Sequence, residues 1–162
     1  MANEKSITLE INGRRRETTI TANQTLLEVL RGLEYFDVKS GCEKGDCGAC
    51  AVLVDGIAVD SCLTFAATLD DRSITTVSGL GKGEQLHPLQ KAFTEMGSIQ
   101  CGYCTPGLII AAKSILDENP DPTDDDLRLG LSGNLCRCTG YTRVFDAIQS
   151  AAKVMRDGGE QG

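Results

Sequence analysis

Alternating polar and apolar residues mark the first part of the chain as a set of β-strands. The stretch SITLEI is followed by Asn12-Gly13, the strongest two-residue signal for a β-hairpin, and then by a returning strand. Apolar residues at helical spacing predict a helix over Thr25–Leu30, with Asn23 or Thr25 as its N-cap. The expected strands are Ser6–Ile11, Arg14–Ile20, Ala51–Val54, Ile57–Val59 and Ser73–Val77.

The pattern changes near Ser78, where the glycine-rich stretch SGLGKG predicts a linker and helical spacing takes over. Thr123 is followed by three aspartates, which suit the positive end of a helix dipole better than a metal site. The tail from Arg156 to Gly162 is expected to fray. The expected helices are Pro88–Met96, Pro106–Asn119, one that begins after Thr123, and Tyr141–Met155. The sequence therefore predicts an α+β fold, with one domain over 1–77, a linker over 78–84 and a helical domain over 85–162.

Charge and composition narrow the class of protein. The 162 residues carry a formal net charge of −7, which argues against nonspecific nucleic-acid binding because that requires a basic surface. The basic run Arg14-Arg15-Arg16 fits a solvated strand face. The first residues lack a basic stretch followed by an apolar one, and no apolar run approaches the roughly 18 residues of a membrane span. We therefore expect a cytoplasmic protein.

Eight cysteines are unusual for such a compartment, where disulfides are rare. The first four follow the spacing C-x4-C-x2-C with a fourth after the second hairpin, which is typical of a plant-type [2Fe–2S] site. Glycines within this loop allow unusual dihedral angles and close approach to a cluster. The first set consists of Cys42, Cys47, Cys50 and Cys62.

The second set shows a weak internal repeat, because two cysteine pairs each precede a Thr and a predicted helix. Helix N-termini favour thiolates, so two such pairs brought together would form a four-thiolate site between helices. The spacing itself matches neither a plant-type loop nor the bacterial two-cluster run. The second set consists of Cys101, Cys104, Cys136 and Cys138.

Other readings of the cysteines remain open at this level. Zinc held by four cysteines is common, and the second set resembles a zinc knuckle more than the first does. A disulfide framework is disfavoured by the expected compartment and by the chain length. His87, the single histidine, is read as a surface or capping residue in preference to a catalytic one or a ligand. No P-loop, dinucleotide fingerprint or zinc-protease motif is present.

Three stretches together resemble a known family. These are G-C-x-x-G-x-C-G-A-C from Gly41 to Cys50, Q-C-G-Y-C-T-P-G from Gln100 to Gly107, and G-N-L-C-R-C-T-G-Y from Gly133 to Tyr141. They are similar to the small iron–sulfur subunit of molybdenum hydroxylases, the xanthine oxidase family, and the resemblance covers nearly the whole chain.

The resemblance implies a plant-ferredoxin-like β-grasp domain followed by a four-helix domain, each with one [2Fe–2S] cluster. It assigns the first cysteine set to the first cluster and the second set to the second. It further implies that Gln100 and Cys138 contact the pterin of a molybdenum cofactor. The residues alone favour a polar cap at the Cys101 loop as the role of Gln100.

The implied function is electron relay. Substrate is oxidised at molybdenum in a large molybdopterin-binding subunit, and electrons pass through both clusters to FAD in a medium subunit or to another acceptor. The chain would act as one subunit of an oxidoreductase, in a dimer of heterotrimers, and would not turn over substrate alone. A free two-cluster ferredoxin and a zinc-stabilised binding module are the alternatives.

Overall fold

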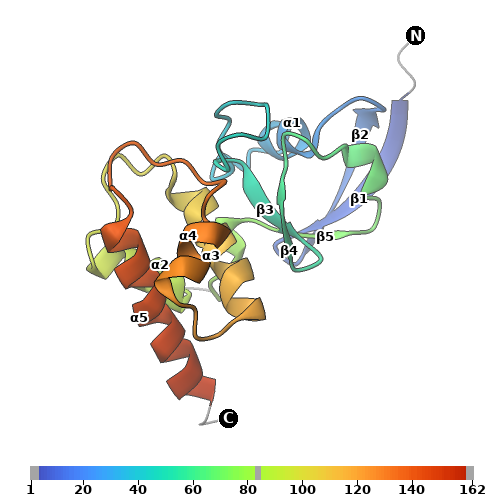
Figure 1. Cartoon of the computed structure of the whole chain (residues 1–162). Helices are drawn as coiled ribbons and strands as arrows, with labels where there is room; N and C mark the ends of the chain where they lie inside the picture. The colour runs from blue at the N-terminus through green and yellow to red at the C-terminus, as the bar shows by residue number, and fades with distance from the viewer. Residues whose placement is uncertain (1–3, 83–84, 160–162) are drawn as a thin grey trace.

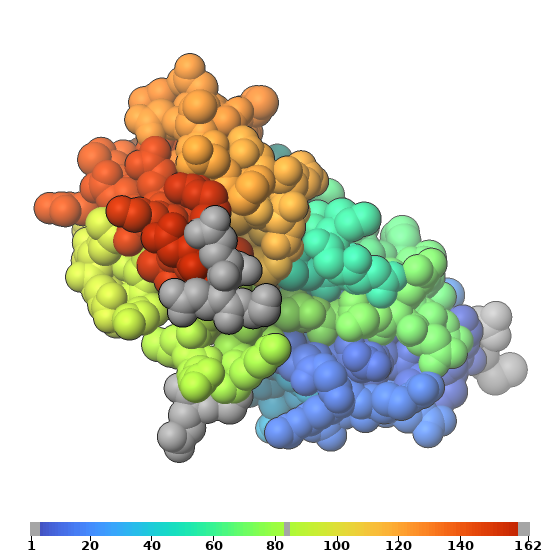
Figure 2. All heavy atoms as spheres, turned by 90° about the horizontal axis from the view of Figure 1, so that it is seen from below, coloured from blue at the N-terminus to red at the C-terminus, as the bar shows by residue number. Residues whose placement is uncertain are grey.

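The computed structural model describes residues 4–82 and 85–159. It consists of a half that contains a β-sheet and a helical half, and the two lie side by side (Figure 1). In the space-filling view the blue-to-green atoms and the yellow-to-red atoms form two lobes in direct contact (Figure 2). The α+β architecture predicted from the sequence is confirmed.

A five-stranded mixed sheet forms the first half. Its order is β2-β1-β5-β3-β4, with β1 parallel to β5 and the other neighbouring pairs antiparallel. Helix α1 (Leu26–Gly32) packs its apolar side into the same core as the sheet, as expected for a β-grasp arrangement. The strands are β1 (Glu4–Ile11), β2 (Arg14–Thr21), β3 (Ala51–Val54), β4 (Ile57–Asp60) and β5 (Ser73–Thr75).

Burial with a period of two explains the first hairpin. Ile7, Leu9 and Ile11 are buried on one face of β1, whereas the three arginines that open β2 are exposed. Of the two N-caps considered for α1, the structure selects Thr25. Its hydroxyl accepts the Glu28 amide at 3.2 Å, and the Glu28 carboxylate accepts the Thr25 amide at 2.7 Å, so two free donors of the first turn are satisfied.

Four helices form the second half: α2 (Pro88–Glu95), α3 (Thr105–Glu118), α4 (Asp124–Gly130) and α5 (Thr142–Gly159). They share a core of buried residues that includes Leu89, Phe93, Leu108, Leu127 and Ile148. Thr123 caps α4 and forms a reciprocal pair of hydrogen bonds with Asp126. The acidic run is therefore a helix start, as the sequence indicated.

His87 is the N-cap of α2, which confirms its interpretation as a capping residue. Its Nδ1 accepts the Leu89 amide at 3.2 Å, and its own amide donates to Gln90 Oε1 at 2.9 Å. Burial and the nearby positive charge of Lys113 lower the pKa of His87, partly opposed by Asp117. The neutral imidazole is therefore favoured in the folded chain, and this is the form that can accept at Nδ1.

Several boundaries differ from the sequence-based expectation, and two of the differences have a visible physical cause. Strand β5 ends at Thr75 rather than Val77, because Thr76 is fully buried and its polar groups bond to Asn12 and Asp37 instead of a neighbouring strand. Helix α5 continues through the first part of the expected frayed tail and ends at Gly159. An ion pair of 2.8 Å between Arg156 and Asp121 holds its last turns. Residues 160–162 and part of the expected linker, 83–84, lie outside the described residues.

Strand β3 and helix α3 make the main contact between the halves. Ala51, Leu53 and Ile110 form a small buried cluster, against which Val77 and Leu80 from the connecting segment pack. The backbones approach most closely at the start of α3. A Cβ added to Gly107 would lie 2.1 Å from the carbonyl oxygen of Gly48, so only glycine fits there without movement of the backbone.

Gly107→Ala is expected to destabilise the contact between the halves. The new methyl group would push the backbone of α3 away from the backbone at Gly48. Overpacking of this kind costs about 1–3 kcal/mol. The denaturation midpoint in urea measures the effect. Gly158→Ala in α5 is the matched control, because nothing lies within 4 Å of a Cβ at that position. Equal midpoints for Gly107→Ala and the wild type would contradict this account of the interface.

Candidate metal centres

The first cysteine set gathers at one end of the sheet. Cys42, Cys47 and Cys50 lie on the loop between α1 and β3, and Cys62 lies just beyond Ser61, after the end of β4. Cys42 and Cys47 are close enough for one thiol to affect the pKa of the other, and the same holds for Cys50 and Cys62. None of the eight cysteines of the chain forms a disulfide. The four thiols that the spacing grouped thus form two pairs.

Backbone amides of the loop point at one of these sulfurs. The amides of Lys44 and Asp46 each lie 3.3 Å from Cys42 Sγ. The Lys44 amide, followed by the bond from Cys47, lowers the pKa of Cys42 to about 7. Burial instead raises the pKa of Cys50 to about 11. The loop therefore favours negative charge on its outer sulfur and shields the inner pair from water.

The second set forms between helices α3 and α5. Cys101 and Cys104 precede or open α3, and Cys136 and Cys138 precede α5. Their sulfurs also lie in two pairs, because Cys138 Sγ is 3.7 Å from Cys101 Sγ, and Cys104 and Cys136 are close enough for each to affect the pKa of the other. The structure therefore brings together the two cysteine pairs of the internal repeat.

The inner and outer pairs of the second set differ in exposure and acidity. Cys101 and Cys138 are exposed, whereas Cys104 and Cys136 are half-buried. Burial raises the pKa of Cys104 to about 12. Burial also opposes ionisation of Cys136, but hydrogen bonds from the side chain and the amide of Thr139, together with smaller contributions from Cys138 and Cys104, outweigh it and lower the pKa of Cys136 to about 7.

Pairs of thiols are the arrangement that a [2Fe–2S] cluster requires. Four thiolates hold the two bridged irons, so that each iron takes two. Each cysteine set of this chain supplies two such pairs. The donor atoms and their grouping fit a binuclear iron–sulfur cluster at both places.

A tyrosine that sequence reasoning did not single out supports the second set. Tyr141 has a left-handed backbone, with φ of 67°, which is strained for a bulky residue. Its hydroxyl accepts the Cys136 amide at 2.7 Å and donates to the Asn134 carbonyl at 2.7 Å. The side chain thus closes the loop that carries Cys136. The only signal in the sequence is its place at the end of the third motif.

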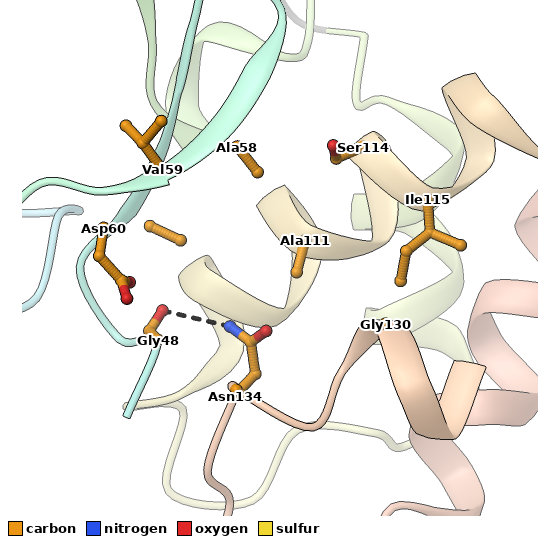
Figure 3. Close-up of a pocket in the computed structure, with 11 residues that line it drawn as sticks. Gly48, Ala58, Val59, Asp60, Ala111, Ser114, Ile115, Gly130 and Asn134 are labelled. Atoms are coloured by element: carbon orange, nitrogen blue, oxygen red, sulfur yellow. Dashed lines mark hydrogen bonds between the residues drawn. The ribbon is translucent and has the colours of Figure 1, made fainter. Parts of the chain in front are cut away.

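Backbone contacts join the loops of the two sets. The Leu135 amide donates to the Cys47 carbonyl at 3.0 Å, and the Asn134 side chain donates to the Gly48 carbonyl at 3.2 Å (Figure 3). Gly48 has φ of +64°, and a Cβ there would lie 2.3 Å from the Asn134 amide nitrogen. Gly48 is therefore required for the contact between the halves as well as for the shape of its own loop.

A cleft of about 230 Å³ opens beside this contact, between β4 and α3. Figure 3 shows Ala58, Val59 and Asp60 on one side and Ala111, Ser114 and Ile115 on the other. The carboxylate of Asp60 is half-buried, and Cys50 Sγ lies 3.7 Å from its Oδ1. Burial raises the pKa of Asp60. The cleft thus contains one acidic group next to the first cysteine set.

Gln100 lies exposed in the loop directly before Cys101. In the described part of the chain its side chain makes no hydrogen bond, so the polar-cap interpretation is not supported by a contact. Tyr103, from the same loop, donates to the carbonyl of Ser40 and so links this loop to the sheet half. Gln100 and the exposed pair Cys101 and Cys138 therefore lie at the surface together.

Fold and cysteine geometry define a two-domain protein built for two [2Fe–2S] clusters, and comparison with known families agrees. The family described as "2Fe-2S iron-sulfur cluster binding domain" matches residues 9–76, and the family described as "[2Fe-2S] binding domain" matches residues 76–149.

Curated relatives extend this match over almost the whole chain. The nicotinate dehydrogenase small FeS subunit of Eubacterium barkeri is 44% identical over 152 residues, which cover 93% of this chain and 97% of that one. The nicotine 6-hydroxylase small subunit of Paenarthrobacter nicotinovorans is 49% identical over 146 residues, which cover 90% and 88%. The chain belongs to the small [2Fe–2S] subunits of the molybdenum hydroxylases, and its function is electron transfer within such multi-subunit oxidoreductases.

Solved structures share the fold. A chain of quinoline 2-oxidoreductase from Pseudomonas putida 86 superposes with a TM-score of 0.90 at 43% identity, covering 96% of this chain and 98% of that one. Aldehyde oxidoreductase from Desulfovibrio gigas gives a TM-score of 0.90 at 42% identity, covering 95% of this chain but 17% of the longer one. The same two-domain unit thus occurs as a separate subunit and as one part of a longer chain. Within residues 4–82 and 85–159, no helix is both long and apolar enough to cross a membrane.

Tyr141→Phe is expected to loosen the second cysteine site. Without the hydroxyl, the Cys136 amide and the Asn134 carbonyl lose their partner, and the strained backbone at residue 141 loses its support. Unpaired polar groups of this kind cost about 1–3 kcal/mol. A lower thermal midpoint, followed by circular dichroism, measures the change. Tyr35→Phe is the control, since the Tyr35 hydroxyl has no hydrogen-bond partner among the described residues. Equal midpoints for both variants would contradict the role given to Tyr141.

Proposed function

We propose that the two cysteine sets are the ligands of the two clusters and that the chain carries electrons between them. Cys42, Cys47, Cys50 and Cys62 hold the first cluster, and Cys101, Cys104, Cys136 and Cys138 hold the second. The grouping of all eight sulfurs into adjacent pairs is the observation that carries this proposal. Each cluster, when bound, accepts and releases one electron.

The protein provides a short connection of covalent bonds and one hydrogen bond between the two ligand sets. From Cys136 the backbone leads to Leu135, whose amide donates to the carbonyl of Cys47 at 3.0 Å. One hydrogen bond and the backbone of three residues thus join a sulfur of one set to a sulfur of the other. Both ends of this connection are fixed, because Tyr141 holds the Cys136 amide and Asn134 holds the Gly48 carbonyl.

We propose that the exposed edge of the second site receives electrons from the pterin of a molybdenum cofactor in a large partner subunit. A contact of Gln100 and Cys138 with that cofactor is supported by their exposure and by their position on adjoining loops. A side-chain amide both donates and accepts, which suits the edge of a heterocycle.

The first site would pass electrons on to FAD in a medium subunit or to another acceptor. The carboxylate of Asp60 beside Cys50 adds negative charge next to a ligand sulfur, which lowers the reduction potential of that site. We further propose the division into domains 1–77 and 85–162 joined by 78–84, a cytoplasmic location, and a dimer of heterotrimers.

The two alternatives from the sequence are less well supported. A zinc-stabilised binding module does not account for a match to [2Fe–2S] families over both halves. A free two-cluster ferredoxin gives no role to the exposed Gln100, and the relatives described above are subunits of larger enzymes or parts of a longer chain.

A tagged, anaerobic pull-down from the native host tests the subunit proposal. The expected result is recovery of a large molybdopterin-containing chain, with or without a flavoprotein, identified by mass spectrometry. Recovery of this chain alone, still carrying iron, would favour the free ferredoxin. A chain that carries zinc in place of iron would exclude the relay.

Cys42→Ser is expected to remove the EPR signal of the first cluster and to leave that of the second. Iron and labile sulfide should each fall from about four to about two per chain. Cys136→Ser is the matched variant for the other site and should give the opposite loss. If Cys42→Ser leaves both signals with unchanged EPR parameters, the first ligand set is wrong.

A further inference from the structure

One hydroxyl group in the chain is aimed at a cysteine sulfur. Thr139 Oγ1 lies 3.1 Å from Cys136 Sγ, and the Thr139 amide lies 3.5 Å from the same sulfur. Over the part of the chain that the structure describes, no other hydroxyl donates to a cysteine. The Thr139 side chain is half-buried, so water competes poorly for this bond.

The direction of the hydroxyl proton follows from a second contact. The amide of Tyr141 donates to Thr139 Oγ1 at 3.2 Å, which occupies an acceptor position of that oxygen. An amide cannot accept the hydroxyl proton, and the sulfur is the acceptor within reach. The strained backbone of Tyr141 is thus part of the arrangement, because it places both the amide at Thr139 and the hydroxyl at Cys136.

Over the described ranges, the other cysteine pair of the internal repeat, Cys101 and Cys104, lacks a hydroxyl-to-sulfur contact of this kind. Thr105 follows Cys104 as Thr139 follows Cys138, and both threonines stand near the start of a helix. In the described residues, however, the hydroxyl of Thr105 makes no bond to a sulfur, and its amide bonds to the carbonyl of Gly102 at 3.3 Å. In the first cysteine set, the amides of Lys44 and Asp46 bond to Cys42 Sγ, and no hydroxyl of the described residues does so.

We propose that Thr139 influences how electrons divide between the two clusters. Its hydroxyl, held by the Tyr141 amide, raises the reduction potential of the second cluster relative to the first. A donor at a ligand sulfur stabilises the form with more negative charge, which is the reduced form. The inference rests on the proposed assignment of Cys136 as a ligand of the second cluster.

Thr139→Val removes the hydroxyl at nearly constant volume and tests the proposal. In the whole chain, purified with its clusters and its partners, a stepwise reductive titration followed by EPR measures how electrons divide between the two clusters. The Cys42→Ser variant assigns the two signals, since it lacks the first. We expect the ratio of reduced to oxidised second cluster, relative to that of the first, to fall roughly tenfold. This is equivalent to about 59 mV for a one-electron couple.

Two further variants isolate the hydroxyl from other effects. Thr139→Ser keeps the donor and should preserve the wild-type electron distribution. Thr105→Val makes the same chemical change beside the other pair and should also preserve it. An unchanged distribution in Thr139→Val would overturn the proposal. So would a shift in Thr139→Ser or Thr105→Val as large as that in Thr139→Val, because packing would then be the cause.

Failure of this inference can be distinguished from failure of the proposed function. If the wild type shows no second cluster, or if Cys136→Ser retains it unchanged, the ligand assignment is wrong. If Thr139→Val does not assemble the second cluster, Thr139→Ala repeats the titration with a smaller side chain. Loss of that cluster in both, with Thr139→Ser intact, would show that the hydroxyl serves assembly and would overturn a role in the potential.

Discussion

The close approach of two backbones at Gly48 is the constraint on which the rest of the structure depends. The start of α3 and the loop before α5 both meet this residue, and a side chain at Gly48 or Gly107 would collide with the opposite backbone. The contact sets how the sheet half and the helical half sit together. Because Cys47 and Leu135 lie directly beside it, the same contact also sets how the two cysteine sets are connected.

The two cysteine sites surround their sulfurs with hydrogen-bond donors and protein in different ways. In the first, the loop itself supplies amides to Cys42, and burial shields Cys50 and Cys62. In the second, side chains from a neighbouring turn act on Cys136, while Cys101 and Cys138 stay exposed. The first site is thus shaped by backbone amides and by burial. The second is shaped by side chains, and two of its sulfurs lie at the surface.

The sequence was sufficient for the strands, the helices and the grouping of the cysteines. Alternation in SITLEI, the Asn-Gly turn and the Thr123 cap are local signals, and each is present in the structure. The end of β5 was missed because Thr76 bonds to Asn12 and Asp37, which are far away in the chain.

The contacts around the sites could not be predicted for the same reason. Asn134 reaches Gly48 across 86 positions of the chain, and no pattern of spacing reveals that pair. The family resemblance names ligands but not the residues that orient them. Thr139 and Tyr141 stood in a recognised motif, yet their roles follow only from the directions of their hydroxyl groups.

The hydrogen bond from Leu135 to Cys47 also limits modular design. Each half has its own core and matches its own family, so the chain looks divisible into two independent ferredoxins. Yet the Cys47 carbonyl in the first loop has its hydrogen-bond partner, the Leu135 amide, in the other half. An engineer who transplanted the β-grasp unit alone would leave that carbonyl to solvent. A design that reuses this pair of cysteine sites therefore has to transfer the whole chain.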